Sequence, residues 1–207
     1  MSLKKTLEDL ALKRYIGPTE SFDLIHVGIL IYYLGENAPK SRSELSKFLG
    51  LGEGSVRTIL KRLKSKGVVK ITRDGVVLDN DGVKLYKELK KAFPIIVSTS
   101  FEAFSLGQFS AIVLIRSGKN RVIRGLEQRD EAIKYGAKAA ITLVYEGKRF
   151  RFPGTDENYD VYYPTETWNK VLKNVAPEEG DAVILCSADS PHNALRGCVA
   201  AALSLSS

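Results

Sequence analysis

Hydrophobic residues recur at helical spacing along the first part of the chain. Residues 4–14 have the pattern of a short amphipathic helix, and residues 22–36 have that of a strongly apolar helix fit for the centre of a domain. Ser41 with Glu44 three positions later has the spacing of a capping box, which predicts a further helix that stops at Gly50. We therefore expect successive helices before residue 50.

The stretch 54–66 has its apolar side chains at positions i, i+3, i+4 and i+7, on one stripe of a helix: Val56, Ile59, Leu60 and Leu63. Two short β-prone runs follow at 68–72 and 76–78, and the Asp74-Gly75 pair between them favours a tight hairpin. A last helix at 83–92 follows the turn Asn80-Asp81-Gly82. From residue 22 onward, the predicted order is helix, helix, helix, hairpin, helix.

Beyond Pro94 the pattern changes to strands interleaved with helices, which predicts two domains, residues 1–94 and 95–207. We expect strands at 109–116, 121–124, 139–145, 149–152 and 182–186, and helices at 126–135, near 166–174 and at 193–205.

The basic excess lies in the first of these domains. Residues 1–94 hold 18 Lys and Arg against 11 Asp and Glu, a net charge of +7, whereas residues 95–207 hold 13 against 13, a net charge of zero. This asymmetry indicates a polyanionic partner for the first domain alone. A solvated basic surface without a partner is the alternative.

The outer face of the 54–66 helix is cationic. Seven Lys and Arg lie from Glu53 to Arg73, with no acid after Glu53 itself. Such a helix can enter a DNA major groove, where Arg, Lys, Ser and Thr reach base edges and phosphates. We expect the DNA-binding residues to be Arg42, Ser43, Ser55, Arg57, Thr58, Lys61, Arg62, Lys64 and Arg73.

Three segments between residues 41 and 82 carry a family resemblance: Ser-Glu-Leu-Ser-Lys-Phe-Leu-Gly-Leu, Ser-Val-Arg-Thr-Ile-Leu-Lys-Arg-Leu and Lys-Gly-Val-Val. They resemble winged helix-turn-helix transcriptional regulators. The resemblance implies a recognition helix at about 54–66 in the major groove and a hairpin wing at about 68–78. The two-domain layout resembles an uncharacterised family of archaeal regulators.

The expected fold class is therefore α+β: an N-terminal winged helix-turn-helix domain followed by a C-terminal α/β domain of hairpins, helices and a final strand-helix unit. The expected function is sequence-specific binding of double-stranded DNA by a cytoplasmic homodimer, with helices 4–14 and 83–92 as candidate dimer contacts. The C-terminal domain would sense a small-molecule effector or mediate assembly.

The best candidate ligand site lies where a strand, a polar turn and a helix succeed one another at 186–196. Ser190 is a predicted N-cap with Pro191 at the first helical position, and such a helix start can bind an anion. The candidate ligand-binding residues are Ser187, Asp189, Ser190, His192 and Arg196. Ordinary helix capping explains the same residues.

Two other functions stay open. The chain could be an enzyme with an appended winged helix, as in biotin protein ligases, although Gly118-Lys119-Asn120-Arg121 is a poor match to their Gly-Arg-Gly-Arg-type loop. The winged helix could also be a protein-protein scaffold. We expect no catalytic residues, cofactor, metal site or membrane span; Cys186 and Cys198 are expected to be buried, reduced thiols.

Overall fold

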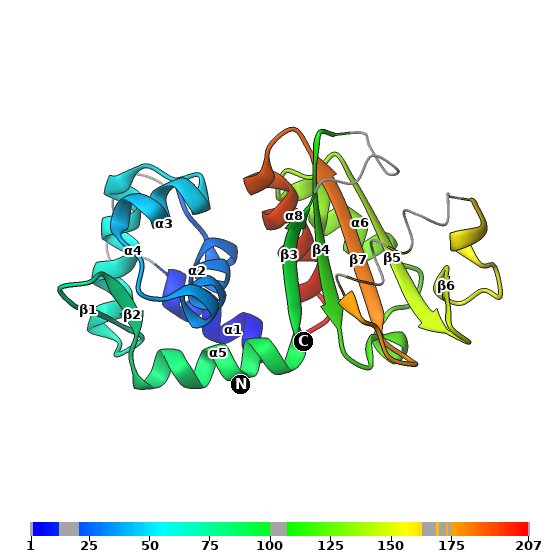
Figure 1. Ribbon diagram of the computed structural model, residues 1–207, viewed down its shortest axis with the longest axis horizontal. Coiled ribbons are helices and arrows are strands. Elements are labelled where there is room, and N and C mark those ends of the chain that lie inside the picture. The colour runs from blue at the N-terminus through cyan, green and yellow to red at the C-terminus, as the bar shows by residue number, and fades with distance from the viewer. Residues whose placement is uncertain are drawn as a thin grey trace. The chain divides into compact units, whose positions relative to one another are not determined.

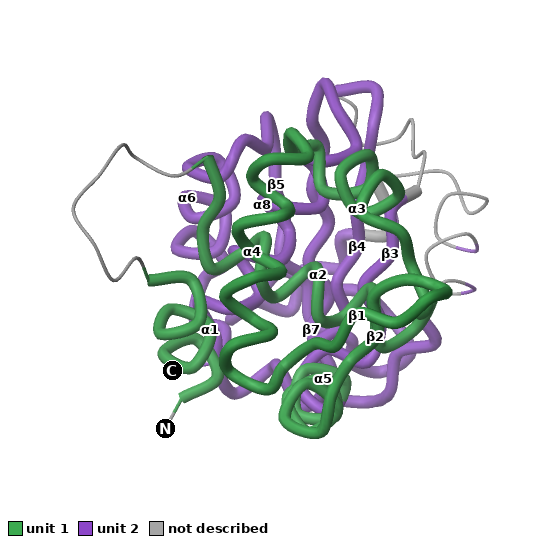
Figure 2. Tube along the Cα trace, turned by 90° about the vertical axis from the view of Figure 1, so that its left-hand side faces the viewer, with its two compact units in different colours: residues 1–90 green, residues 91–207 purple. Residues whose placement is uncertain are grey.

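Residues 2–12, 21–99, 107–162, 169, 173 and 175–206 are described in the computed structural model of the chain. The chain divides into an N-terminal unit, residues 1–90, and a C-terminal unit, residues 91–207 (Figure 2). Together they form a mixed α+β protein. Within the described ranges, no helix is long and apolar enough to cross a membrane.

The N-terminal unit consists of helices and one hairpin (Figure 1). The elements are α1 Leu3–Ala11, α2 Leu24–Asn37, α3 Arg42–Leu49, α4 Glu53–Ser65, β1 Val69–Ile71, β2 Val76–Leu78 and α5 Asn80–Ala92. The capping box of α3 is formed as predicted: the Glu44 backbone N–H donates to Ser41 Oγ, and the Ser41 N–H donates to Glu44 Oε2. The helix ends at Gly50 in the left-handed conformation, where glycine avoids the strain of a Cβ.

The predicted stripe of α4 is the side that the helix buries. Val56, Ile59, Leu60 and Leu63 are each at most 1% exposed. Helix α2 is buried on nearly all sides, as its unbroken apolar sequence predicts, and it packs against α1, α3 and β2. These helices supply the core of the N-terminal unit.

The start of α5 corrects one prediction, because Asn80-Asp81-Gly82 is the first turn of the helix and not a turn before it. The Val83 N–H donates to the carbonyl of Asp79, the residue just before the helix, so the helical hydrogen bonds start ahead of Asn80. A Cβ on Gly82 would lie 2.0 Å from the carbonyl oxygen of Val68. The glycine therefore serves the close packing of the helix against the hairpin, not a reversal of the chain.

The C-terminal unit is a five-stranded antiparallel sheet in the order β3-β4-β7-β5-β6. Its strands are β3 Ile95–Thr99, β4 Phe109–Ile115, β5 Ala139–Glu146, β6 Arg149–Arg151 and β7 Ala182–Ala188. Helices α6 Leu126–Lys134 and α8 Pro191–Leu203 lie side by side on one face of this sheet (Figure 1), and α8 packs on the two strands β4 and β7. Short 3-10 helices, η1 Gly118–Arg121 and η2 Tyr159–Tyr162, complete the described elements.

Two predictions for this unit are wrong. No strand forms at 121–124: the chain folds into η1, and Arg121 turns its Nη2 back to the carbonyl of Arg116 at 2.7 Å. The sequence analysis also missed β3, which pairs with β4 from Ile95↔Leu114 to Thr99↔Ser110. The helix predicted near 166–174 falls largely on residues outside the described ranges.

The two thiols are buried and free, as predicted, with Cys198 Sγ 3.2 Å from the carbonyl oxygen of Ile184. Burial raises the pKa of the Cys186 thiol well above its ordinary value. Both cysteines therefore contribute to packing between β7 and α8.

Candidate nucleic-acid interface

Helix α4 has two flanks beside its buried stripe, and the chain uses them differently. One flank carries Ser55, Arg62 and Lys66, the last being the C-cap residue of the helix. The other carries Arg57, Lys61 and Lys64, which are four and three residues apart and so share a face. The sequence analysis did not distinguish the two flanks.

The first flank holds the N-terminal segment. Arg62 Nη1 donates a hydrogen bond to the carbonyl of Ala11 at the end of α1, and the guanidinium lies 5.2 Å from the centre of the Phe22 ring. Lys66 Nζ donates to the carbonyl of Asp9. Ser55 Oγ is 2.6 Å from Ser21 Oγ. Two residues assigned to DNA from the sequence, Ser55 and Arg62, thus make contacts inside the unit.

The second flank faces solvent. Arg57, Lys61 and Lys64 are exposed, and within the described ranges none of them forms an ion pair or a side-chain hydrogen bond. Thr58 is also exposed, but its hydroxyl donates to the carbonyl of Gly54 at 3.0 Å, one helical turn earlier. The cationic groups of this flank keep their charge and hydrogen-bond donors available to a partner.

The hairpin is fixed to the segment between α2 and α3. Lys40 and Val76 form an isolated bridge, with the Val76 N–H 2.8 Å from the Lys40 carbonyl and the Lys40 N–H 3.1 Å from that of Val76. A Cβ on Gly75 would come within 2.7 Å of the Lys40 carbonyl oxygen. The glycine predicted from Asp74-Gly75 is therefore required both for its φ of +137° and for this approach.

Exposed cations continue onto the hairpin and the start of α3. Lys70 lies on β1, and Arg73 lies in the turn that the Thr72 N–H closes on the Gly75 carbonyl at 2.8 Å. Arg42 and Ser43 are exposed in the first turn of α3. There Glu44 adds a negative charge, since the Ser41 backbone N–H, the Ser41 hydroxyl and Lys40 hold the pKa of its carboxyl at about 2.

The predicted ligand residues have contacts of their own. Ser190 caps α8 by accepting a hydrogen bond from the Asn193 N–H at 3.2 Å, with Pro191 at the first helical position. Asp189 forms an ion pair of 2.7 Å with Lys138. Ser187 is buried in β7, His192 is half-buried, and Arg196 lies 6.0 Å from the centre of the Tyr135 ring. Among these residues the structure records a helix cap, an ion pair and a cation–π contact.

A cavity of about 360 Å³ opens elsewhere in the C-terminal unit, between η1, the end of β5 and the loop after β6. Its walls include Lys119 and Glu146. Sequence reasoning missed both: Lys119 was considered only in the comparison with a ligase loop, and Glu146 lies just beyond the strand expected at 139–145. A signal existed only in three dimensions, because 26 residues separate the two in sequence on either side of α6.

Comparisons with known proteins match both halves of the chain. Residues 27–84 match the family model described as PH0730-like, N-terminal domain, and residues 106–205 match that of a domain of unknown function (DUF4443). No curated protein matches the chain. A solved structure, the hypothetical protein PH0730 from Pyrococcus horikoshii OT3, is similar with 28% sequence identity and a TM-score of 0.73, over 89% of this chain and 93% of that chain. The chain is thus similar in sequence and in fold to an archaeal protein along nearly the whole length of both.

Proposed function

We propose that the protein is a sequence-specific DNA-binding transcriptional regulator whose N-terminal unit works as a winged helix-turn-helix domain. In this assignment α3 and α4 are the two helices of the motif, α4 is the recognition helix and the β1–β2 hairpin is the wing. The order of elements and the fixed hairpin support it. A regulator of this kind acts where the chromosome is, in the cytoplasm.

The observation that carries the proposal is the solvent-facing flank of Arg57, Lys61 and Lys64 on α4, without ion pairs inside the described ranges. If neighbouring acids held the cations of a helix in ion pairs, few charged hydrogen-bond donors would remain to bind phosphates. Here the chain satisfies the cations of the opposite flank with backbone carbonyls and leaves these three to solvent. Guanidinium and ammonium groups are the donors that read guanine and neutralise phosphates.

The contacts divide into two classes. Arg57 lies near the start of the helix, where a recognition helix reaches base edges, and Lys61 lies one turn later on the same face, so we assign both to sequence reading. Lys64, Lys70, Arg42 and Arg73 are assigned to the sugar-phosphate backbone, with Arg73 near a minor groove. We omit Ser55 and Arg62 from the interface because of their contacts within the unit.

A single recognition helix reads a short half-site, so we propose that the regulator binds as a homodimer to a site with two-fold symmetry. The C-terminal unit would sense an effector or mediate assembly.

The experiment is a selection of bound duplexes from a random pool by the full chain, followed by sequencing. We expect enrichment of one motif arranged as an inverted repeat. A pool that stays unenriched, with no duplex retained even at low salt, would contradict the proposal and favour a scaffold or an enzyme.

A further inference from the structure

The cavity in the C-terminal unit has a rigid wall. The loop after β6 has internal backbone hydrogen bonds. The Phe152 N–H donates to the Glu157 carbonyl, and the Thr155 N–H donates to the Phe152 carbonyl, each at 3.2 Å. Gly154 has a φ of +75°, and a Cβ on it would be in ordinary van der Waals contact, 3.4 Å, with the Ile123 carbonyl oxygen of the segment opposite. The η1 segment is held in turn, since the Lys119 N–H donates to the Gly180 carbonyl at 3.0 Å. The cavity is therefore built by backbone that its own hydrogen bonds fix.

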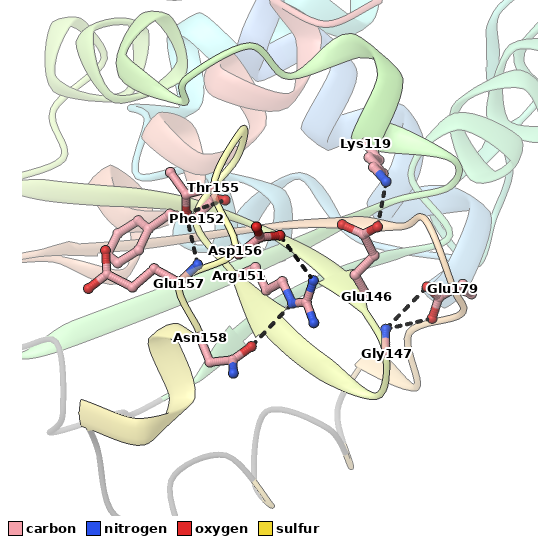
Figure 3. A network of polar contacts seen from close by, with 10 residues as sticks. All are labelled: Lys119, Glu146, Gly147, Arg151, Phe152, Thr155, Asp156, Glu157, Asn158 and Glu179. Atoms are coloured by element: carbon pink, nitrogen blue, oxygen red, sulfur yellow. Dashed lines mark hydrogen bonds and ion pairs between the residues drawn. The ribbon is translucent and has the colours of Figure 1, made fainter.

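Two opposite charges meet inside it. Lys119 Nζ and Glu146 Oε1 are 2.5 Å apart, and Figure 3 shows the lysine reaching from its segment onto the carboxylate of the strand below. The hydrogen bond from Lys119 lowers the pKa of Glu146, so this carboxyl is ionised at neutral pH. Arg151, beside them, has its Nε 3.2 Å from Asn158 Oδ1 and its Nη1 3.8 Å from Asp156, a carboxylate that also lines the cavity.

Apolar side chains line the same cavity. Val122 and Val144 are buried beneath it, whereas Ile123 is 73% exposed beside them. A large aliphatic side chain left in water next to a cavity is a surface that an apolar ligand group could cover. The cavity thus joins the Lys119–Glu146 pair, a second carboxylate at Asp156 and an aliphatic surface, and its volume lies near the lower end of small-molecule sites.

We propose that this cavity binds a small zwitterion of the α-amino-acid class with an aliphatic side chain. The ligand's ammonium group replaces Lys119 on Glu146, its carboxylate takes the released Lys119 ammonium, and its side chain lies against Ile123 and Val122. A ligand with both charges exchanges one ion pair for two and leaves no charge unmatched. A ligand with one charge could form only one of these two new ion pairs, and that difference is the basis of selectivity.

The site is separate from the helix start at Ser190 that the sequence suggested. This ligand-binding proposal does not depend on the proposed DNA binding, because ligand binding is measured on the protein without DNA. Failure of either proposal leaves the other standing.

The test is isothermal titration calorimetry and thermal unfolding of the full chain with L-leucine and L-valine. Isoamylamine and isocaproate, which keep the leucine side chain but lack the carboxylate or the ammonium group, are the ligand controls. We expect at least one amino acid to bind and raise the unfolding temperature, and both controls to bind at least about tenfold more weakly.

Variants locate the binding site. Lys119→Met and Glu146→Gln should each remove binding. The matched controls are Lys134→Met and Glu131→Gln. They make the same changes in a surface ion pair on α6, with Lys134 Nζ 3.6 Å from Glu131 Oε1, and both should keep ligand binding. An exposed ion pair contributes little to folding, so all four variants should unfold near the wild-type temperature without ligand. The proposal is overturned if neither amino acid binds, if isoamylamine or isocaproate binds as tightly, or if binding survives in Lys119→Met and Glu146→Gln.

Discussion

Arg62 Nη1 donates a hydrogen bond to the main-chain carbonyl of Ala11, so a cation of α4 caps the C-terminal end of α1. The carbonyl groups in the last turn of a helix have no partner within the helix, and a guanidinium is a suitable donor for them. The same guanidinium stacks near the Phe22 ring, at the start of the segment that leads into α2. Arg62 thus connects parts of the N-terminal unit that are far apart in sequence.

This contact predicts that Arg62→Ala lowers the free energy of unfolding by about 1–3 kcal/mol, from a charge-assisted hydrogen bond and a cation–π contact. Lys64→Ala, two positions away on the solvent flank, should change it by less than about 0.5 kcal/mol. Urea unfolding of both variants measures the difference. Equal stability of the two variants would show that Arg62 does not hold the N-terminal segment.

The capping box of α3 predicts a pH-dependent stability. The pKa of Glu44 is lowered from 4.5 to about 2, first by the hydrogen bond from the Ser41 backbone N–H. A lowered pKa means that the folded state favours the carboxylate. The contribution of the Glu44 carboxylate to the free energy of unfolding is therefore complete above the ordinary pKa of 4.5, and it is lost as the pH falls toward 2.

The urea midpoints of wild type and Glu44→Gln should therefore differ at neutral pH and converge over that acid range. Glu88→Gln, which removes an exposed carboxylate of α5, is the control and should follow wild type at every pH. A Glu44→Gln difference that persists unchanged at low pH would contradict the assignment.

Two helical glycines should respond to alanine with opposite signs. A Cβ on Gly54 in α4 would meet no atom within 4 Å, so Gly54→Ala should stabilise the protein by about 0.5–1 kcal/mol through the lower backbone entropy of alanine. A Cβ on Gly197 in α8 would lie 2.7 Å from the Ala137 Cβ and 2.8 Å from the Ala132 carbonyl oxygen. Gly197→Ala should therefore destabilise by about 1–3 kcal/mol. Thermal unfolding checks both, and a stabilising Gly197→Ala would refute the close approach of α8 to α6.

Local patterns predicted the helices and the hairpin of the N-terminal unit because their determinants are local. Each of these determinants lies within a short stretch of sequence: the Ser41–Glu44 capping box, the apolar stripe of α4 and the Asp74-Gly75 turn. Gly82 was misinterpreted for the opposite reason. Its small size serves a contact with Val68, fourteen residues earlier, which no local pattern reveals.

The same limit applies to the candidate sites. Arg62 and Arg57 are the same residue type on the same helix, and only the position of α1 separates an arginine that holds the fold from one that faces solvent. Likewise, β3 forms only because it pairs with β4. The cavity forms only because Lys119 and Glu146 meet in space, although α6 lies between them in the sequence. The sequence supplied residue types and periodicity, whereas long-range packing decided their use.

The central claim is that the solvent-facing flank of α4 binds duplex DNA. Its most direct test is the salt dependence of binding by Arg57→Ala/Lys61→Ala beside Arg129→Ala/Lys134→Ala, which likewise removes one exposed Arg and one exposed Lys, from α6. We predict that the α4 variant binds the selected duplex at least about tenfold more weakly, with the slope of log K against log salt reduced by about 1–2. The α6 variant should bind like wild type. An α4 variant whose affinity and slope match those of wild type would contradict the account.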